Sequence, residues 1–185
     1  MQACEINELV KCSQDELYFI MTYFKADNPF SGFSTLNLEV KQLNILNKVI
    51  NKHLILDRIK ERQIGTSTIL VAHALWLALF KPDQRIIFMN PNHAQSANAR
   101  FIIKQAVVDL PFFMRPNIIT DHKESMEFDN GSWIHFTNGD SNHLRGVNTT
   151  LIIADTFGYF KDEWQRDLRR HANAFGLETE ELLKV

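Results

Sequence analysis

The segment Arg62–Thr68 has the composition of a loop that binds phosphate. It reads Arg-Gln-Ile-Gly-Thr-Ser-Thr and lies between an apolar run suited to a strand and a second apolar run suited to a helix. Backbone N–H groups near Gly65, together with the amino end of the following helix, would face an anion bound there. The segment therefore predicts a nucleotide phosphate site. The alternative is a plain strand-to-helix turn in which Thr66, Ser67 and Thr68 only cap the helix.

Position 66 lacks the lysine that a phosphate-binding loop normally has at this place. Thr66 offers a hydroxyl group but no positive charge. A hydrogen bond to a charged group contributes roughly 1.5–3 kcal/mol, so we expect any nucleotide to bind weakly.

A second candidate residue for chemistry is Asp155. It follows the apolar run Thr150–Ala154, which is typical of a central parallel strand. An acidic residue at such a strand end can hold Mg²⁺ directly or through water, with a hydroxyl of the phosphate loop as a second ligand. We therefore predict Asp155 and Ser67 as metal ligands, with capping of the next turn as the alternative role of Asp155.

Alternating helices and strands must position these two places. Hydrophobic periodicity and turn residues predict helices at Ser13–Lys25, Leu38–Lys52, Ser67–Phe80, Asn92–Asp109 and Asp162–Ala174, and a short helix within Glu178–Lys184. A capping box formed by Ser13 and Glu16 would open the first of these helices. The predicted strands are His53–Ile59, Arg85–Met89, Asn117–Asp121, Ser125–Phe128, Trp133–Thr137 and Thr150–Ala154. Asn130-Gly131 is a strong hairpin signal between two of these strands. This order favours an α/β fold with a mostly parallel sheet and an inserted antiparallel hairpin.

Composition limits the class of protein. The chain has 185 residues, of which 45% are hydrophobic and 23% charged, which suits one domain with a sizeable core. A formal net charge of −2 gives no overall attraction to nucleic acid, so DNA binding would require a local patch, and whether the chain binds DNA directly stays open. The candidate patch is Arg166, Arg169 and Arg170, for which a solvated helix face is the simpler interpretation.

Targeting signals and cysteine usage favour an intracellular protein. The longest apolar run, Ile69–Phe80, is too short to span a bilayer, and the amino-terminal residues do not form a secretory signal, so we predict no membrane partner. Cys4 and Cys12 match no usual zinc spacing, and two thiols indicate a reducing compartment.

The ordered series of motifs resembles the ATPase half of the large terminase subunit, the DNA-packaging motor of tailed bacteriophages. That family has an Arg-Gln-x-Gly-Lys-Ser/Thr-Thr phosphate loop, which Arg62–Thr68 matches except at position 66. The similarity extends over about residues 16–160, with further matches at Leu110–Met114, Phe128–Ser132 and Arg145-Gly146. The last match is Asp155-Thr156, at the place where the family has Asp-Glu.

The resemblance implies a P-loop NTPase-like three-layer fold that binds ATP and Mg²⁺. It implies that Gln42 contacts adenine, although a solvated helix face is its alternative place, and that Arg62 is the family's in-cis arginine. The implied nucleotide-binding set is Gln42, Arg62, Gln63, Gly65, Thr66, Ser67 and Thr68.

Two departures from the family bear on activity. Thr66 replaces the lysine between the phosphates, and Thr156 replaces the glutamate that activates the attacking water. Losing a general base typically costs on the order of 10²–10⁴ in rate, so we name no catalytic residue beyond the candidate Arg62 and expect ATP hydrolysis to be absent or very slow. We also expect binding of ATP and Mg²⁺ to be weak or absent.

The resemblance also predicts an organisation. We expect an amino-terminal helical segment at 1–30, the terminase ATPase-like core at 31–160 and a carboxy-terminal helix at 161–185. The family continues beyond the Asp-Glu strand with a coupling motif, whose strand lies between the two nucleotide-binding strands in related ATPases. The sequence offers no such segment, so we expect the sheet to close up, to take a strand from elsewhere in the chain or to pair with another chain.

Three functions follow from the resemblance. The first is a degenerate terminase-like domain in the cytoplasm of a bacterial host, acting on phage packaging or motor proteins through protein contacts. The second is an ATPase fragment in which Lys60 or Arg62 replaces the missing lysine and a partner supplies the base. The third is an interaction module or decoy that joins or blocks a motor assembly, with self-association as one form of it.

Overall fold

The computed structural model describes residues 2–28, 32–58, 65–138 and 147–182. The elements are helices α1 (Ala3–Gln14), α2 (Glu16–Tyr23), α3 (Val40–Val49), α4 (Thr66–Phe80), α5 (His93–Asp109) and α6 (Asp162–Phe175), the short 3-10 turns η1 (Phe112–Met114) and η3 (Phe157–Tyr159), and strands β1 (Lys25–Asn28), β2 (Gly32–Thr35), β3 (Leu54–Asp57), β4 (Arg85–Asn90), β5 (Ile118–Asp121), β6 (Ser125–Phe128), β7 (Trp133–Asn138), β8 (Leu151–Ala154) and β9 (Thr179–Leu182).

A seven-stranded sheet orders the described part of the chain, with strand order β5-β6-β7-β4-β8-β3-β9. The five strands from β7 to β9 are parallel, and β5 and β6 add an antiparallel extension. The predicted hairpin turn joins β6 to β7, and Gly131 there has a φ of 80°, which a glycine adopts at little cost. The predicted mostly parallel α/β sheet with an inserted antiparallel hairpin is confirmed.

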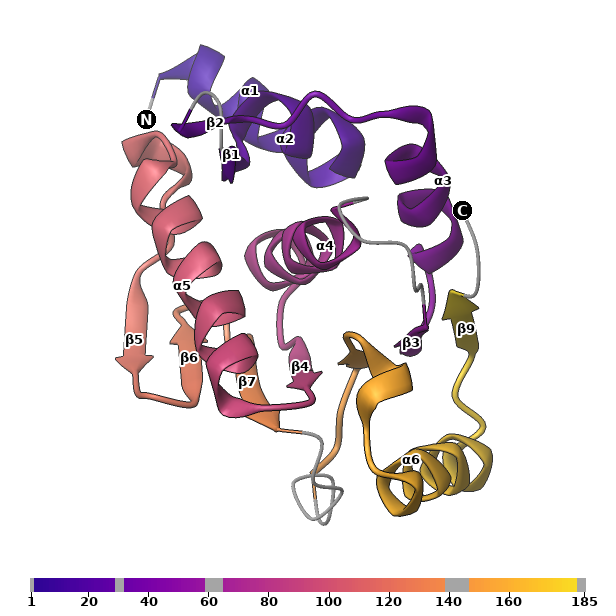
Figure 1. Cartoon of the computed structure of the whole chain (residues 1–185). Helices are drawn as coiled ribbons and strands as arrows, with labels where there is room; N and C mark the ends of the chain where they lie inside the picture. Colours follow the sequence, from indigo (N-terminus) through magenta and orange to yellow (C-terminus); the bar gives the residue numbers. More distant parts are fainter. Residues whose placement is uncertain (1, 29–31, 59–64, 139–146, 183–185) are drawn as a thin grey trace.

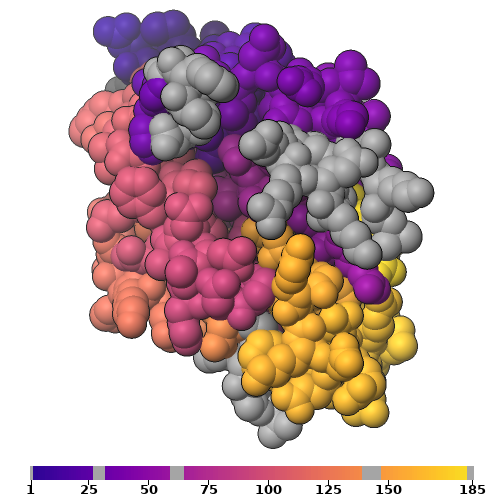
Figure 2. Space-filling view, in the orientation of Figure 1, coloured from indigo at the N-terminus to yellow at the C-terminus, as the bar shows by residue number. Residues whose placement is uncertain are grey.

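Helices cover both faces of the sheet and make three layers (Figure 1). Because side chains alternate along a strand, Ile55 and Ile153 pack into a core with α2 to α5, whereas Leu56 and Ile152 pack on the other face with Leu168 of α6. The central strands β3 and β8 are fully buried, which explains why they read as continuous apolar runs. In the view of Figure 2, α5 and the orange-to-yellow segment that contains α6 are both visible at the surface.

The start of the chain corrects one prediction. Helix α1 runs through Ser13, whose hydroxyl donates back to the carbonyl of Val10, so Ser13 does not cap a helix. Asp15 caps α2 instead, because its carboxylate accepts a hydrogen bond from the N–H of Tyr18 at 2.9 Å. Helix α2 ends at Tyr23, and Lys25 already belongs to β1.

The end of the described chain corrects another. The short helix predicted within 178–184 is wrong, because Thr179–Leu182 forms β9 and pairs in parallel with β3. Burial of Leu182 in the main core and a full ladder with β3 outweigh the local preference of its two glutamates for a helix.

The sheet also shows how the chain does without the coupling-motif strand. Strand β3 pairs directly with β8, so no strand lies between them, and β9 pairs with the opposite side of β3. Of the three expected arrangements, the chain thus shows the closed-up sheet, and β9 extends the sheet beyond β3 instead of filling the missing place. Among the described residues, no helix has both the length and the apolar character needed to cross a bilayer.

Candidate nucleotide and metal site

The carboxyl ends of β3 and β8 lie side by side and place the site. The two strands are in parallel register, with Leu56 opposite Ala154, so the residues that follow, Asp57 and Asp155, leave the sheet at the same edge. Ligands of open α/β sheets bind at this edge. Helix α4 begins close by, at Thr66, directly after Gly65.

The two predicted metal ligands are in contact. The hydroxyl of Ser67, in the first turn of α4, donates a hydrogen bond to Oδ1 of Asp155 at 2.9 Å. Oδ2 of Asp155 accepts a second hydrogen bond from Nδ2 of Asn90, the last residue of β4, at 3.0 Å. Residues 88 positions apart in the sequence are thus joined where a P-loop enzyme would hold its metal ion.

Gly65 has the backbone geometry that a phosphate loop requires. Its φ of 79° is left-handed, a conformation open to glycine but strained for other residues. Gln42 of α3 lies against this glycine, since a Cβ built on Gly65 would be 2.6 Å from Nε2 of Gln42. Oε1 of Gln42 accepts from the N–H of Glu39, which fixes the side chain at the start of α3. The structure thus brings Gln42 to Gly65, while its contact with adenine stays a prediction.

This packing predicts the cost of a side chain at position 65. Gly65→Ala should lower the free energy of unfolding by about 1–2 kcal/mol from the left-handed backbone alone, with a further loss from the contact with Gln42. Urea unfolding measures it. The control is Gly176→Ala, because Gly176 has a φ of 60° but only open space around a built Cβ. Equal losses in the two variants would show that Gln42 does not press on the glycine.

The other predicted nucleotide-binding residues are placed in part. Thr66 is buried as the first helical residue, and Thr68 is half-buried in the same turn. Gly65 is the residue that precedes the helix, and no side chain caps α4, so the alternative role of the three hydroxyls as side-chain caps finds no support. Arg62 and Gln63 lie outside the described residues, as do Lys60 and the Arg145-Gly146 pair.

Asp57 is a residue of this site that the sequence predictions missed. It is 2% exposed, and Asp155 is 4% exposed. Burial raises the pKa of Asp155 to about 7, assisted by the charge of Asp57 and by a hydrogen bond between the two carboxyl groups, against opposing hydrogen bonds from Ser67 and Asn90. The two buried carboxyl groups therefore lie together inside the site.

Asn90 was also missed, for a similar reason. The predicted strand at His53–Ile59 extends past Asp57, and the predicted strand at Arg85–Met89 ends one residue before Asn90. Each is in fact the last residue of a buried parallel strand. Such residues can be found in a sequence by looking for a polar residue at the end of an apolar run that predicts a buried parallel strand.

Thr156 follows Asp155 at the position where the resembled family has its glutamate. It has a φ of 54°, which is uncommon for a β-branched residue, and its buried hydroxyl has no hydrogen-bond partner among the described residues. Strained residues with unused polar atoms cluster at active sites, which makes Thr156 a candidate functional position. A threonine hydroxyl cannot act as a base near neutral pH.

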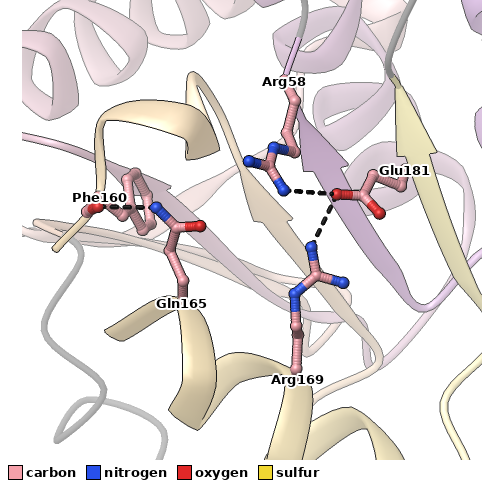
Figure 3. Close-up of polar contacts among 5 residues, drawn as sticks. All are labelled: Arg58, Phe160, Gln165, Arg169 and Glu181. Carbon is pink, nitrogen blue, oxygen red and sulfur yellow. Dashed lines mark hydrogen bonds and ion pairs between the residues drawn. The ribbon is translucent and has the colours of Figure 1, made fainter. Parts of the chain in front are cut away.

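A pair of arginines holds β9 beside the site (Figure 3). Glu181 of β9 accepts from Arg58 at 3.1 Å and from Arg169 of α6 at 2.8 Å, and Arg58 directly follows Asp57. Burial would raise the pKa of Glu181, but the hydrogen bonds and charges of the two arginines lower it overall. Arg169 is thus engaged in an ion pair, as is Arg170 with Asp167, which reduces the predicted basic patch on α6.

Removing the charge of Glu181, which accepts hydrogen bonds from both arginines, should destabilise the contact of β9 with Arg58 and Arg169. Glu181→Gln is expected to lower the free energy of unfolding by about 1 kcal/mol, because two charge-assisted hydrogen bonds lose their anion. Chemical denaturation at neutral pH measures the change, and Glu180→Gln on the same strand is the control outside this network. A loss in the Glu180 variant as large as that in the Glu181 variant would assign the effect to the strand rather than to the arginines.

Comparison with solved structures identifies the architecture. No family model matches the sequence. A mutant form of the large terminase ATPase domain of Thermus phage P74-26 matches with a TM-score of 0.59 and 12% identity, over 79% of this chain and 64% of that one. The unmutated domain matches with a TM-score of 0.54 and 11% identity, over 80% and 70%. The large terminase of bacteriophage HK97 matches with a TM-score of 0.69 and 14% identity, over 93% and 37%.

The chain has the fold of phage large-terminase ATPase domains. The resemblance inferred from the motifs is confirmed at the level of the fold, including its P-loop-like three-layer form. The chain spans less than two thirds of the length of the P74-26 mutant domain and of the HK97 terminase. At 11–14% identity the likeness defines the terminase fold, and the chemistry depends on the residues described above.

Proposed function

We propose that this chain is a packaging-motor-like domain that has lost most of its capacity to hydrolyse ATP and acts through contacts with phage packaging proteins in the host cytoplasm. The observation that supports this best is the contact of Ser67 with Asp155. This contact is the one expected between the two ligands of a P-loop metal site, while the neighbouring positions that need a cation and a base hold Thr66 and Thr156.

The electrostatics of the site support weak nucleotide binding. A triphosphate would approach the buried pair of Asp57 and Asp155 without the lysine that offsets its charge in P-loop enzymes. The turn at Gly65 and the amino end of α4 still offer N–H groups to an anion. We therefore assign ATP with Mg²⁺ as a weak ligand, and the contacts with packaging proteins as the main activity.

Calorimetric titration with Mg²⁺ and ATP, followed by a turnover assay, tests the proposal. We expect weak or undetectable binding and no turnover above the uncatalysed rate. Robust hydrolysis that Asp155→Ala abolishes would overturn it. Turnover that appears only when a phage packaging protein is added would favour the rival function, an ATPase fragment completed by a partner. Light scattering with and without packaging proteins then measures whether the chain joins a complex or self-associates.

A further inference from the structure

A cavity of about 1030 Å³ lies at the edge of the sheet opposite to the nucleotide site. His53, Gln84 and Thr150 line it just before the starts of β3, β4 and β8, whereas Asp57 and Asp155 lie at the carboxyl ends of β3 and β8. Its other walls come from α2, α3 and α4, which pack together on one face of the sheet (Figure 1). This space, the amino-edge cavity, is large enough for a small organic ligand, because such pockets usually measure about 300–1,000 Å³.

His73 of α4 and Glu16 of α2 form a buried polar pair in the wall of the amino-edge cavity. Nδ1 of His73 lies 2.7 Å from Oε1 of Glu16, and the two residues are 2% and 7% exposed. Nε2, the other nitrogen of the ring, is buried and has no hydrogen-bond partner among the described residues. Buried polar atoms are nearly always satisfied in folded proteins, so Nε2 indicates a missing partner.

Charge balance determines whether Nε2 donates or accepts a hydrogen bond. A carboxylate beside a neutral imidazole would leave an uncompensated charge in a buried place, which is costly. The pair is balanced when Glu16 is ionised and His73 carries both ring hydrogens, or when Glu16 keeps its proton and His73 is neutral. These arrangements differ by the transfer of one proton along the hydrogen bond, and in both of them Nε2 carries a hydrogen. The missing partner is therefore a hydrogen-bond acceptor.

The rest of the wall favours a carboxylate that has an apolar body. Nζ of Lys81 lies 4.9 Å from the ring centre of Trp76 and donates to a backbone carbonyl, and no carboxylate pairs with it within the described part of the chain. The other lysine of the wall, Lys52, is already paired with Glu178 at 3.3 Å. Asp15, an exposed acid of the wall, is engaged in capping α2. The apolar surface of the cavity is supplied by Leu43, Leu46, Ile50, Trp76 and Leu77.

We infer that the amino-edge cavity binds a small monocarboxylate with an apolar chain. The carboxylate accepts a hydrogen bond from Nε2 of His73, and the positive charge of Lys81 on the same wall attracts it. The chain of the ligand packs on the apolar side chains of α3 and α4. This site is separate from the one at Asp155, so the inference goes beyond the proposed function and does not depend on it.

Titration of the purified full chain with octanoate, followed by calorimetry in buffer without nucleotide at neutral pH, tests the inference. We expect one site with a Kd on the order of 0.1–1 mM, as suits a ligand of this size. Octylammonium has the same chain with the opposite charge, and acetate has the same head group without the chain. Both should bind at least about tenfold more weakly, because each lacks one of the two interactions.

Variants of the wall locate the site. Asn47 lines the cavity from an exposed position on α3, so Asn47→Trp should fill the space without disturbing the core and weaken octanoate binding by about tenfold or more. Lys81→Met should weaken it by about 2–10-fold. Lys11→Met is the matched control, because Lys11 also lies over an aromatic ring, that of Tyr18, but is not among the described residues of this wall. Its affinity should equal that of the unchanged chain.

The imidazole ¹⁵N spectrum of the chain labelled at histidine reports on Nε2 directly. We expect a hydrogen on Nε2 of His73 in the free chain and a shift of its resonance as octanoate saturates the site. His73→Gln identifies that resonance and should weaken binding by about tenfold. If this variant fails to fold, Asn47→Trp and Lys81→Met decide.

Three results would overturn the inference. The first is the absence of octanoate binding below about 10 mM, which would leave Nε2 to a buried water molecule. The second is equal affinity for octanoate and octylammonium, which would remove the role of the carboxylate. The third is unchanged octanoate binding in both Asn47→Trp and Lys81→Met, which would place the ligand elsewhere.

Discussion

Thr66→Lys combined with Thr156→Glu should raise the rate of ATP hydrolysis by about 10²–10⁴-fold over that of the unchanged chain. The first change places a cation on the first residue of α4, directly after the left-handed turn at Gly65. The second places a carboxylate directly after Asp155, at a residue whose hydroxyl is buried without a partner. The rest of the constellation, Ser67 on Asp155, already stands in the arrangement such an enzyme uses.

Phosphate release from ATP with Mg²⁺, under saturating nucleotide, measures this gain. Each single variant should gain far less, because a base without bound nucleotide and a bound nucleotide without a base both leave the chemical step slow. The control adds Asp155→Asn to the double variant and should return the rate to the background. A double variant that binds ATP tightly yet gains no turnover would show that the site has lost more than these two groups.

The stability of the unchanged chain should respond to pH through the buried carboxyl pair. The pKa of Asp155 rises from an ordinary 3.8 to about 7 on folding, chiefly because of burial and then because of Asp57. Between these values the folded chain binds more protons than the unfolded chain, so the stability that this group contributes is present below about pH 4 and is lost as pH rises to 7. At 1.36 kcal/mol per pKa unit, the loss is on the order of a few kcal/mol.

Urea unfolding in EDTA at pH 5 and pH 8 compares the unchanged chain with Asp155→Asn. The amide cannot ionise, so the variant should lack this loss and should gain stability at pH 8 relative to the unchanged chain. Asp121 and Glu181 have lowered pKa values and respond in the opposite sense, so only the difference between the two proteins isolates Asp155. Identical pH profiles would mean that Asp155 does not bind its proton more tightly in the folded chain.

The meeting of Ser67 and Asp155 could be predicted from sequence because two strong local signals obey a general rule of topology. A glycine turn between a strand and a helix, and an acid after an apolar strand, both belong at the carboxyl edge of a parallel sheet. Because the carboxyl ends of parallel strands meet at the same edge of the sheet, two residues 88 positions apart in the sequence could be expected to lie close together. Gln42, which the resemblance singled out, lies against Gly65, and its role in binding adenine stays a prediction.

Other parts of the site depend on contacts that no local pattern contains. Asp57 is one polar residue at the end of a short strand, and only the pairing of β3 with β8 makes it the neighbour of Asp155. The same limit applies to β9, since the sequence Thr-Glu-Glu-Leu is a poor strand by propensity. It forms a strand because β3 offers an open ladder and the main core accepts Leu182.

The position of β9 late in the sequence delays the completion of the sheet while the chain is being synthesised. Leu54 leaves the ribosome more than a hundred residues before Thr179, its partner in the parallel ladder. At roughly 5–20 residues per second, one side of β3 waits on the order of ten seconds without its neighbour. Until Leu151–Ala154 is made, β3 also lacks β8, and afterwards one row of its amide and carbonyl groups stays open to pairing until β9 is added.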